Sequence, residues 1–327
     1  MTSELTWRPF GPDDLDELFG LISRVQDHDR ENERTTRHDL DVAAARPWID
    51  LSTDSLMAVD DSGVPRAWGR TGFRPGESTS LTVQLLGGVD PDWRGLGLGR
   101  RILAWEAERA MVIAETLRDD ASVPVQVGGF VENHLDDRRR LFEAGGFVAS
   151  RYFNELRQTI PSPLVDLAPL PAPLELVPFD ESNSDRVRIA LNISFADHWG
   201  YAAIDPDRWA VEAATPTFRP ALSAAIVDRS TPGEPVVAFV LNSEYEEDWD
   251  DPAKKEGYVE YLGVIPEWRS HGLASYLLNL TAARFAGVGH THVALGVDTE
   301  NVTGAMRLYE SLGYEQVHGT TYYSTTV

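Results

Sequence analysis

Glycines and an arginine stand before a predicted helix at two places in the sequence. The first stretch is WRGLGLGRRILAWE, residues 93–106, and the second is WRSHGLASYLLNLT, which starts at Trp268. The start of a helix exposes unpaired N–H groups and a positive dipole end, and glycine lets an anion approach the backbone. The glycine spacing matches neither the P-loop nor the dinucleotide fingerprint. Both stretches instead share the pattern [Q/R]-x-x-G-x-[G/A], which predicts a phosphate-binding turn.

The two turns belong to a longer internal repeat. Arg94 and Arg269 are 175 positions apart, and they follow the related segments VDPDW and VIPEW. Farther along, LFEAGGF from Leu141 returns as LYESLGY from Leu308, an offset of 167. Two matches in the same order and at similar offsets predict the duplication of a whole domain.

Prolines separate the two copies. The stretch 160–179, IPSPLVDLAPLPAPLELVPF, contains six prolines. Proline fixes its own φ and disfavours helix in the residue before it, so this stretch predicts an extended linker. We therefore expect an N-terminal domain over residues 1–160, a linker over 161–173 and a C-terminal domain over 174–327.

Both halves show the same predicted order of strands and helices. A strand and a helix come first, then three strands, the helix after the glycine turn, a strand, a helix and a closing strand. In the second half these segments are 174–179, 184–197, 221–227, 235–241, 257–264, the helix from 273, 290–297, 304–313 and 314–327. This order predicts an α+β fold of two tandem domains, each a mixed, mostly antiparallel sheet flanked by helices.

Composition limits the partners. With 29 Lys and Arg against 52 Asp and Glu, the formal net charge is −23. Such a field repels nucleic acid and anionic membranes, so we expect neither partner; it attracts small cations, although acidic solubility alone also accounts for it. The sequence has no apolar run of about 20 residues and no leader pattern, which predicts a cytoplasmic protein. Without cysteine, and without a third ligand near His290 and His292, we expect no metal.

The turn pattern, set between a strand and a helix, resembles the GNAT superfamily of acetyl-CoA-dependent N-acyltransferases over nearly the whole chain. In that family the turn binds the cofactor pyrophosphate through N–H groups, and the preceding strand pairs with the pantetheine arm. The resemblance therefore implies acetyl-CoA as the acyl donor. The implied cofactor residues of the second half are Leu262, Gly263, Val264, Arg269, Ser270, His271, Gly272, Leu273, Ala274, Ser275 and Asn301, the last of which either caps a helix or reaches the cofactor. Those of the first half are Gly87, Gly88, Val89, Arg94, Gly95, Leu96, Gly97, Leu98, Gly99 and Arg100.

The resemblance also implies which half is catalytic. Family enzymes usually transfer the acetyl group directly: a carboxylate on the strand before the turn takes the amine proton, and a tyrosine on a later helix protonates the sulfur. Glu260 and Tyr309 occupy these places in the second half, where a solvated carboxylate and a packed ring are the structural alternatives. Alignment of the halves puts Leu85 opposite Glu260 and Phe142 opposite Tyr309, so we expect the first half to be non-catalytic.

Aromatic residues indicate where the acceptor binds. The segment FADHWGYAAIDPDRW follows the first helix of the second half, where family members build one wall of the acceptor pocket. An aromatic face stabilises a cation by about 0.5–2 kcal/mol. Strand alternation predicts that Tyr258, Glu260 and Leu262 share one face. Core packing is the alternative role for these rings. The expected substrate-binding residues are His198, Trp199, Tyr201 and Tyr258.

Together these features predict an enzyme that acetylates a primary amine of a small molecule. The tandem order and the segment GAMRLYESLGY are most similar to mycothiol-synthase-type members of the family, which acetylate the cysteinyl amine of a sugar-linked thiol precursor. The segment DHWG differs from their acceptor segment, so the acceptor stays open. The alternatives are a protein amino-group acetyltransferase and a non-catalytic acyl-CoA sensor.

Overall fold

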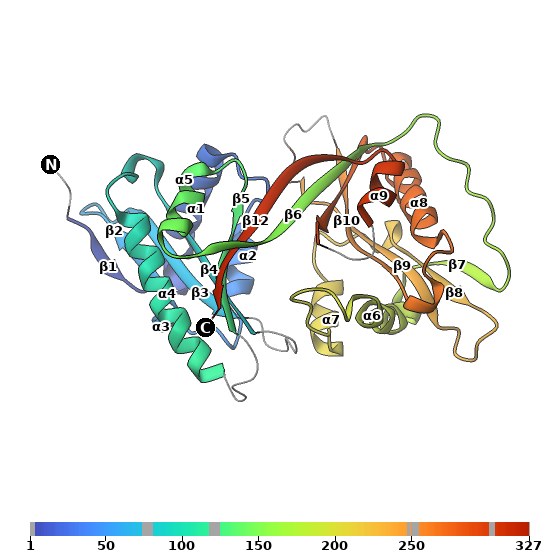
Figure 1. Ribbon diagram of the computed structural model, residues 1–327, viewed down its shortest axis with the longest axis horizontal. Coiled ribbons are helices and arrows are strands. Elements are labelled where there is room, and N and C mark those ends of the chain that lie inside the picture. Colours follow the sequence, from blue (N-terminus) through green and yellow to red (C-terminus); the bar gives the residue numbers. More distant parts are fainter. Residues whose placement is uncertain are drawn as a thin grey trace. The chain divides into compact units, whose positions relative to one another are not determined.

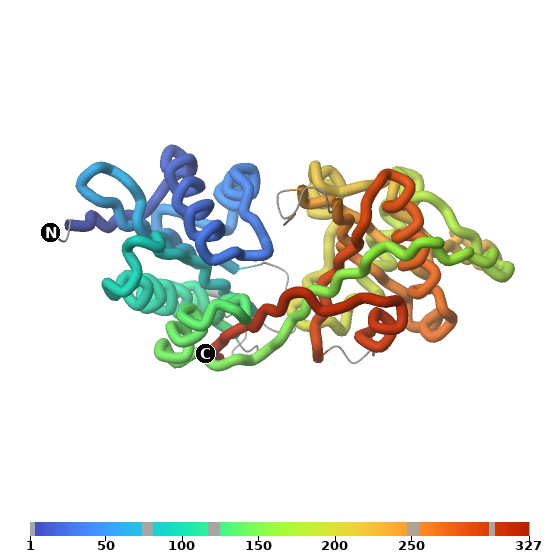
Figure 2. The backbone as a smooth tube through the Cα atoms, turned by 90° about the horizontal axis from the view of Figure 1, so that it is seen from above, coloured from blue at the N-terminus to red at the C-terminus, as the bar shows by residue number. Residues whose placement is uncertain are grey.

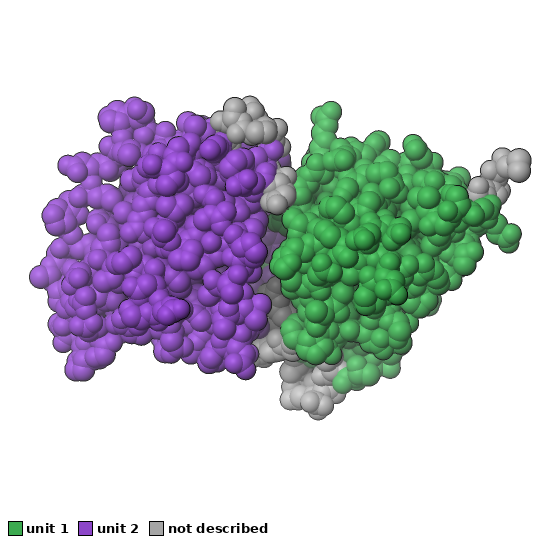
Figure 3. All heavy atoms as spheres, turned by 180° about the vertical axis from the view of Figure 1, so that it is seen from behind, with its two compact units in different colours: residues 1–152, 319–327 green, residues 153–318 purple. Residues whose placement is uncertain are grey.

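The chain folds into two compact units. A computed structural model describes residues 4–73, 81–117, 125–246, 249, 255–300 and 305–326. Unit 1 comprises residues 1–152 and 319–327, and unit 2 comprises residues 153–318 (Figure 3). Within the described residues, no helix is long and apolar enough to span a membrane.

Unit 1 is an α+β sheet domain. Its described strands lie in the order β1-β2-β3-β4-β5-β12, in which only β4 and β5 are parallel. The strands are β1 (Thr6–Arg8), β2 (Ser55–Val59), β3 (Pro65–Phe73), β4 (Leu81–Val89), β5 (Val125–Glu132) and part of β12 (Glu315–Thr326). The helices are α1 (Leu15–Asp29), α2 (Arg37–Ala44), α3 (Leu51–Asp54), α4 (Leu98–Leu117) and α5 (Asp136–Ala144), with 3₁₀ turns at Pro12–Asp14 and Pro91–Trp93.

Unit 2 repeats this plan. Its described strands lie in the order β6-β11-β10-β9-β8-β7, in which only β10 and β11 are parallel. The strands are part of β6 (Val148–Thr159), β7 (Leu174–Pro178), β8 (Ala224–Asp228), β9 (Val236–Ser243), β10 (Glu256–Val264) and β11 (His292–Asp298). The helices are α6 (Glu181–Phe195), α7 (Pro206–Ala213), α8 (Leu273–Gly287) and α9 (Ala305–Ser311), with 3₁₀ turns at Pro220–Leu222 and Pro266–Trp268. The predicted tandem α+β fold with mixed, mostly antiparallel sheets is confirmed.

The last strand of each sequence half pairs in the other unit. β6 ends the first half, yet its residues 153–159 pair with β11 of unit 2. β12 ends the second half, yet its residues 320–326 pair with β5 of unit 1. The two strands are neighbours in the strand order, as the green and red ribbons show (Figures 1 and 2). The units therefore differ from the expected domains at residues 153–160 and 319–327, because strand pairing does not follow the order of the repeat.

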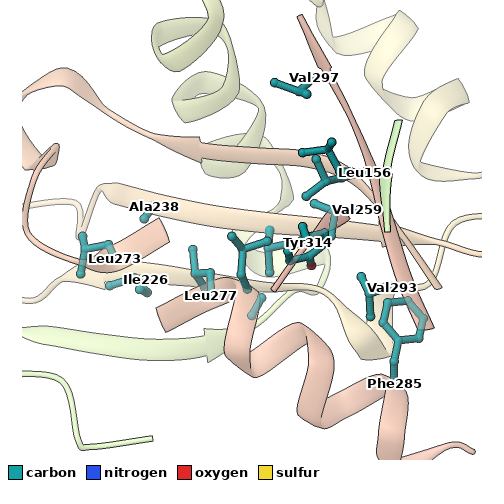
Figure 4. Close-up of a cluster of buried hydrophobic side chains, with 14 of the residues drawn as sticks. Leu156, Ile226, Ala238, Val259, Leu273, Leu277, Phe285, Val293, Val297 and Tyr314 are labelled. Atoms are coloured by element: carbon teal, nitrogen blue, oxygen red, sulfur yellow. The ribbon is translucent and has the colours of Figure 1, made fainter. Parts of the chain in front are cut away.

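The sheet of unit 2 is covered on both faces. Residues of α8 and α9 pack with Val259, Val293 and Leu295 on one face (Figure 4), and residues of α6 and α7 pack with Phe239 and other side chains on the opposite face (Figure 1). Every residue of the central strand β9 is buried, as expected for a strand with helices on both sides. Unit 1 has the same layers, with α4 and α5 on one face and α1 and α2 on the other.

The linker agrees with its proline pattern, whereas three short helices were not predicted from the sequence. Residues 160–173 contain no helix or strand, in agreement with the proline pattern. The helices α2, α3 and α7 were not predicted, since each is at most eight residues long, which is too short for a helical period to stand out in the sequence. α7 does carry a capping signal: the Asp205 side chain accepts from the Arg208 amide (2.9 Å), with Pro206 at the first helical position.

Candidate active site

The glycine turn of unit 2 presents a row of backbone donors. Ser270 (φ 65°) and Gly272 (φ 76°) are both left-handed, and α8 begins at Leu273, whose side chain is anchored in the core (Figure 4). The first amide of the helix with a backbone acceptor is that of Tyr276, which donates to Gly272 O (3.0 Å). Among the described residues, the amides of 270–275 have no acceptor. Six donors at a helix N-terminus suit a phosphate.

Unit 1 builds the same turn. Gly95 (φ 78°) and Gly97 (φ 84°) repeat the left-handed positions of Ser270 and Gly272. The Arg101 amide donates to Gly97 O (3.1 Å), and the amides of 95–100 have no acceptor within the described part of the chain. Leu96 between the glycines is 58% exposed, whereas Leu98 packs against a buried cluster and Gly99 sits against Leu141. The duplication thus extends to backbone conformation.

The motif arginine of each half bonds to protein atoms. Arg269 Nε donates to Val264 O (3.4 Å) and Nη2 to Ser194 O (3.3 Å). Arg94 Nε donates to Val89 O (3.3 Å), and its Nη1 and Nη2 bind the Asp29 carboxylate (2.7 and 2.8 Å). In both units the guanidinium therefore ties the turn to the end of the preceding strand and to the end of the first helix. These hydrogen bonds indicate that the arginine positions the turn.

The strand before each turn separates from its parallel neighbour. The β10–β11 ladder ends at Val259↔Leu295, so residues 261–264 pair only with β9 in the described ladders. The β4–β5 ladder likewise ends at Gln84↔Gly128, before the predicted cofactor residues Gly87, Gly88 and Val89. The edge of residues 262–264 that faces away from β9 is therefore open to a further strand-like partner.

A β-bulge distinguishes β10 from β4. Val259 pairs with Asn242 and Tyr261 with Leu241, which leaves Glu260 as an extra residue. Val259 and Leu262 both pack in the core under α8, so Tyr258, next to Val259, points to the opposite face from Leu262. The expectation that Tyr258, Glu260 and Leu262 share one face is therefore wrong. The bulge reverses the alternation after Val259.

The bulge also changes the alignment of the two halves. The β3–β4 ladder runs from Ala67↔Val89 to Phe73↔Val83 without a shift. Leu85 (4% exposed) is buried under α4 as Val259 (5% exposed) is buried under α8, which makes Val259 its counterpart. The predicted alignment of Leu85 with Glu260 is corrected accordingly: Glu260 has no equivalent in β4.

Glu260 lies among aromatic side chains. Its carboxylate is exposed, and its Oε2 accepts a hydrogen bond from the Tyr245 hydroxyl (2.7 Å). The Tyr245 ring meets the Tyr258 ring edge to face, with centroids 5.6 Å apart and planes at 82°. Burial, and then the charge of Glu260, raises the pKa of Tyr245, so the tyrosine stays protonated and donates. Tyr245 was not singled out from the sequence.

Tyr309 lies on the face of the sheet that α8 covers. It stands on α9 and packs, partly buried, against the same core as Leu262 and Val264. Its ring centroid is 5.9 Å from that of Tyr314. Burial raises the pKa of Tyr309 to about 12, so the hydroxyl keeps its proton at neutral pH. Asn301, also expected near the cofactor, lies outside the described residues.

The predicted acceptor residues form two groups in unit 2. Tyr258 belongs to the Glu260 group through Tyr245. His198 and Tyr201 lie beside Phe195, with ring centroids 4.4 and 5.7 Å away. The ring of Phe195 in turn packs against that of Tyr261, the residue after Glu260, with centroids 5.7 Å apart. Phe195 and Tyr261 thus extend the aromatic wall that the sequence indicated only in part.

Two predicted acceptor residues also have structural partners. The Tyr201 hydroxyl donates to Asn192 Oδ1 (2.7 Å), and burial raises the pKa of Tyr201 to about 12. The rings of Trp199 and Phe153 of β6 have centroids 6.1 Å apart.

The remaining predicted turn residues lie at the start of α8. His271 is exposed, with Nδ1 2.8 Å from Arg269 O, while Ala274 and Ser275 are half-buried.

The residues of unit 1 that the sequence alignment placed opposite Tyr309 and Glu260 are apolar and buried. Phe142, aligned with Tyr309, is 7% exposed and packs against Phe147 and Tyr323. Leu85 is part of the same cluster. The turn is therefore common to both units, whereas the carboxylate and the tyrosine that the sequence singled out occur only in unit 2. No group of three metal-ligating side chains occurs among the residues that the structure describes.

Comparison with known proteins agrees with this geometry. Residues 191–314 match the acetyltransferase (GNAT) family. A mycothiol acetyltransferase of Kocuria rhizophila is 30% identical over 213 residues, 64% of this chain and 68% of that protein. A GCN5-related N-acetyltransferase from Sphaerobacter thermophilus has a TM-score of 0.73 at 21% identity, over 98% of this chain and 95% of that one. A tandem GNAT protein from the clavulanic acid biosynthesis pathway has a TM-score of 0.68 at 14% identity, over 99% and 98%.

The splayed strands and the glycine turns thus belong to a chain of the GNAT family, and the protein is an N-acetyltransferase. The family uses acetyl-CoA as the acyl donor. Within it, this chain is of the tandem type and resembles the mycothiol acetyltransferases.

Proposed function

We propose that unit 2 transfers an acetyl group from acetyl-CoA directly to a primary amine of a small molecule. The observation that carries this proposal is the bulge residue Glu260, which sits where β10 leaves β11 and is bonded by Tyr245. β4 of unit 1 has a glycine turn after it but no such residue. We infer that unit 1 does not catalyse the transfer.

The residues present fit acetyl-CoA. The unbonded amides of residues 270–275 would hold the pyrophosphate, and the open edge of residues 262–264 would pair with the pantetheine arm. A Cβ added at Gly272 would meet no atom within 4 Å, so the space beside the turn is clear of protein. Arg269 holds the turn in place through Val264 O and Ser194 O.

The side chains of unit 2 supply the proton transfers. When bound, acetyl-CoA supplies the acetyl group as a thioester. Glu260 accepts the proton that the amine loses as its nitrogen joins the acetyl carbon. Tyr309 holds a proton at neutral pH and gives it to the sulfur that leaves, so the products are an amide and a thiol.

The acceptor side favours a small cationic amine. The Glu260 carboxylate accepts a hydrogen bond from Tyr245, which packs on Tyr258, and Tyr261 follows Glu260 in the chain. A carboxylate beside aromatic rings attracts an ammonium group. The net charge of −23 also attracts cationic molecules to the protein. Since a relative is named a mycothiol acetyltransferase, the amine of a mycothiol precursor is the first acceptor to test.

The test is thiol release from acetyl-CoA with a panel of amines. Glu260→Gln and Tyr309→Phe should each lower kcat by about 10²- to 10⁴-fold. The matched controls are Glu267→Gln, an exposed carboxylate before the turn, and Tyr314→Phe, whose hydroxyl has no hydrogen-bond partner. Near-normal turnover in both test variants would refute the roles. Binding of acetyl-CoA without thiol release for any amine would favour the sensor, and turnover with peptides alone would favour protein acetylation.

A further inference from the structure

The carboxylate of Glu260 depends on a loop outside its own strand. Tyr245 follows β9 and reaches across to the bulge of β10, where its hydroxyl lies 2.7 Å from Glu260 Oε2. The residue stands fifteen positions before Glu260 in the chain.

The Tyr245 ring is itself fixed. It packs edge to face on Tyr258, and the Tyr258 hydroxyl lies 3.0 Å from the place where a Cβ on Gly296 would stand. Gly296 therefore leaves room for Tyr258, Tyr258 supports Tyr245, and Tyr245 binds Glu260. An exposed glutamate otherwise has several rotamers available, and a bond from a supported ring selects one of them.

We propose that Tyr245 is a positioning residue that orients Glu260 and stabilises its ionised form as a proton acceptor. The inference rests on the proposed function of Glu260. Its chemical basis is that a tyrosyl O–H donates to the charged form of a carboxylate, which lowers the pH at which the carboxylate becomes available. The proton from the amine goes to Glu260, while Tyr245 keeps its own proton throughout.

Removal of one hydroxyl tests this role in the full chain. In Tyr245→Phe, the ring contact with Tyr258 is kept and the bond to Glu260 is lost. A hydrogen bond to a charged group is strong enough to shift a titration by about one pH unit or somewhat more. We expect the acidic limb of the kcat profile to move up by about one unit, with KM for acetyl-CoA unchanged.

A second readout does not depend on turnover. The Glu260 side-chain carboxyl can be titrated by ¹³C NMR in the chain without acetyl-CoA, in the parent protein and in Tyr245→Phe. The expected result is a higher midpoint in the variant. Tyr314→Phe is the matched control, because it removes a buried tyrosyl hydroxyl that has no hydrogen-bond partner.

The outcomes separate this inference from the proposed function. If Glu260→Gln is inactive but Tyr245→Phe keeps both the parent pH profile and the parent Glu260 midpoint, the positioning role is overturned and Glu260 remains the base. If Glu260→Gln keeps full turnover, the proposed function fails and this inference fails with it. Tyr245→Phe added to Glu260→Gln should cause no further change in the profile, and a further shift would also overturn the role.

Discussion

At the scale of single residues, a buried carboxyl group in unit 1 has an unusual environment. Glu106 of α4 is 3% exposed, and its Oε1 has no hydrogen-bond partner. This oxygen lies 3.0 Å from the place where a Cβ on Gly69 would stand and 3.1 Å from that of Gly87. Burial raises the pKa of Glu106 to about 8. At the corresponding position of α8, unit 2 has the uncharged, fully buried Thr281.

Glu106 predicts a pH-dependent stability. Its folded pKa is raised above the reference value of 4.5, so the folded state keeps a proton that the unfolded state releases. The stabilising effect of that proton is complete below about pH 4.5 and is lost as the pH rises toward about 8. Glu106→Gln should therefore raise Tm more at pH 8 than at pH 5. Thermal melts at both values check this, with the exposed Glu108→Gln of the same helix as control; equal changes at the two values would contradict it.

At the scale of elements, alanine substitutions can separate what a left-handed glycine contributes to stability from what the glycine turn contributes to acetyl-CoA binding. Gly272 (φ 76°) precedes α8, and Gly313 (φ 84°) follows α9; a Cβ on either would meet no atom within 4 Å. Alanine at either site should cost about 1–2 kcal/mol, because a left-handed conformation is unfavourable for a residue with a Cβ. Only Gly272→Ala should also raise the KM for acetyl-CoA, since only that change distorts the donors of residues 270–275. Denaturant titration and initial rates measure the two effects, and an equal KM in both variants would rule out the cradle.

The sequence predicted the glycine turns of the site but not the bulge in β10 or the position of Tyr245. The turns were predicted because glycine, arginine and the start of a helix carry a local signal, and in both halves a helix begins within the motif, at Leu98 and at Leu273. The bulge was missed because one extra residue in GYVEYLGV leaves an apparently regular alternation, and only the partner strand reveals the shift at Glu260. Tyr245 was missed for a similar reason. It lies in a run of acidic residues in the sequence, and only the pairing of β9 with β10 brings Tyr245 to the bulge.

At the scale of the whole molecule, the sequence indicated two copies but not the pairing of their last strands. β6 and β12 have similar patterns and follow similar helices, so either could complete either sheet by composition alone. The edges of β5 and β11 to which these strands pair are equivalent in the same way. Strand order is a long-range property, which the local pattern does not contain. The outcome is that residues 319–327 complete unit 1, although they end the second half of the sequence.

This exchange makes the stability of unit 1 depend on the C-terminal strand. Tyr323 of β12 is 4% exposed, pairs with Gly129 of β5 and packs on Phe142 with ring centroids 6.0 Å apart. Tyr323→Ala removes a large buried ring and should destabilise unit 1 by about 3 kcal/mol. Amide exchange followed by mass spectrometry should show the loss of protection in β5, while β10 of unit 2 stays protected.

The matched control for this change is Tyr152→Ala on β6, where the tyrosine is 45% exposed. It removes the same ring from a strand surface without opening the core, so β5 should keep its protection. If Tyr323→Ala left β5 protected and instead weakened β10, the C-terminal strand would stabilise the half that encodes it and the exchanged pairing would be wrong. A protein in which each sheet needs a strand from the other half is expected to lose unit 1 whenever the C-terminal residues 319–327 are removed.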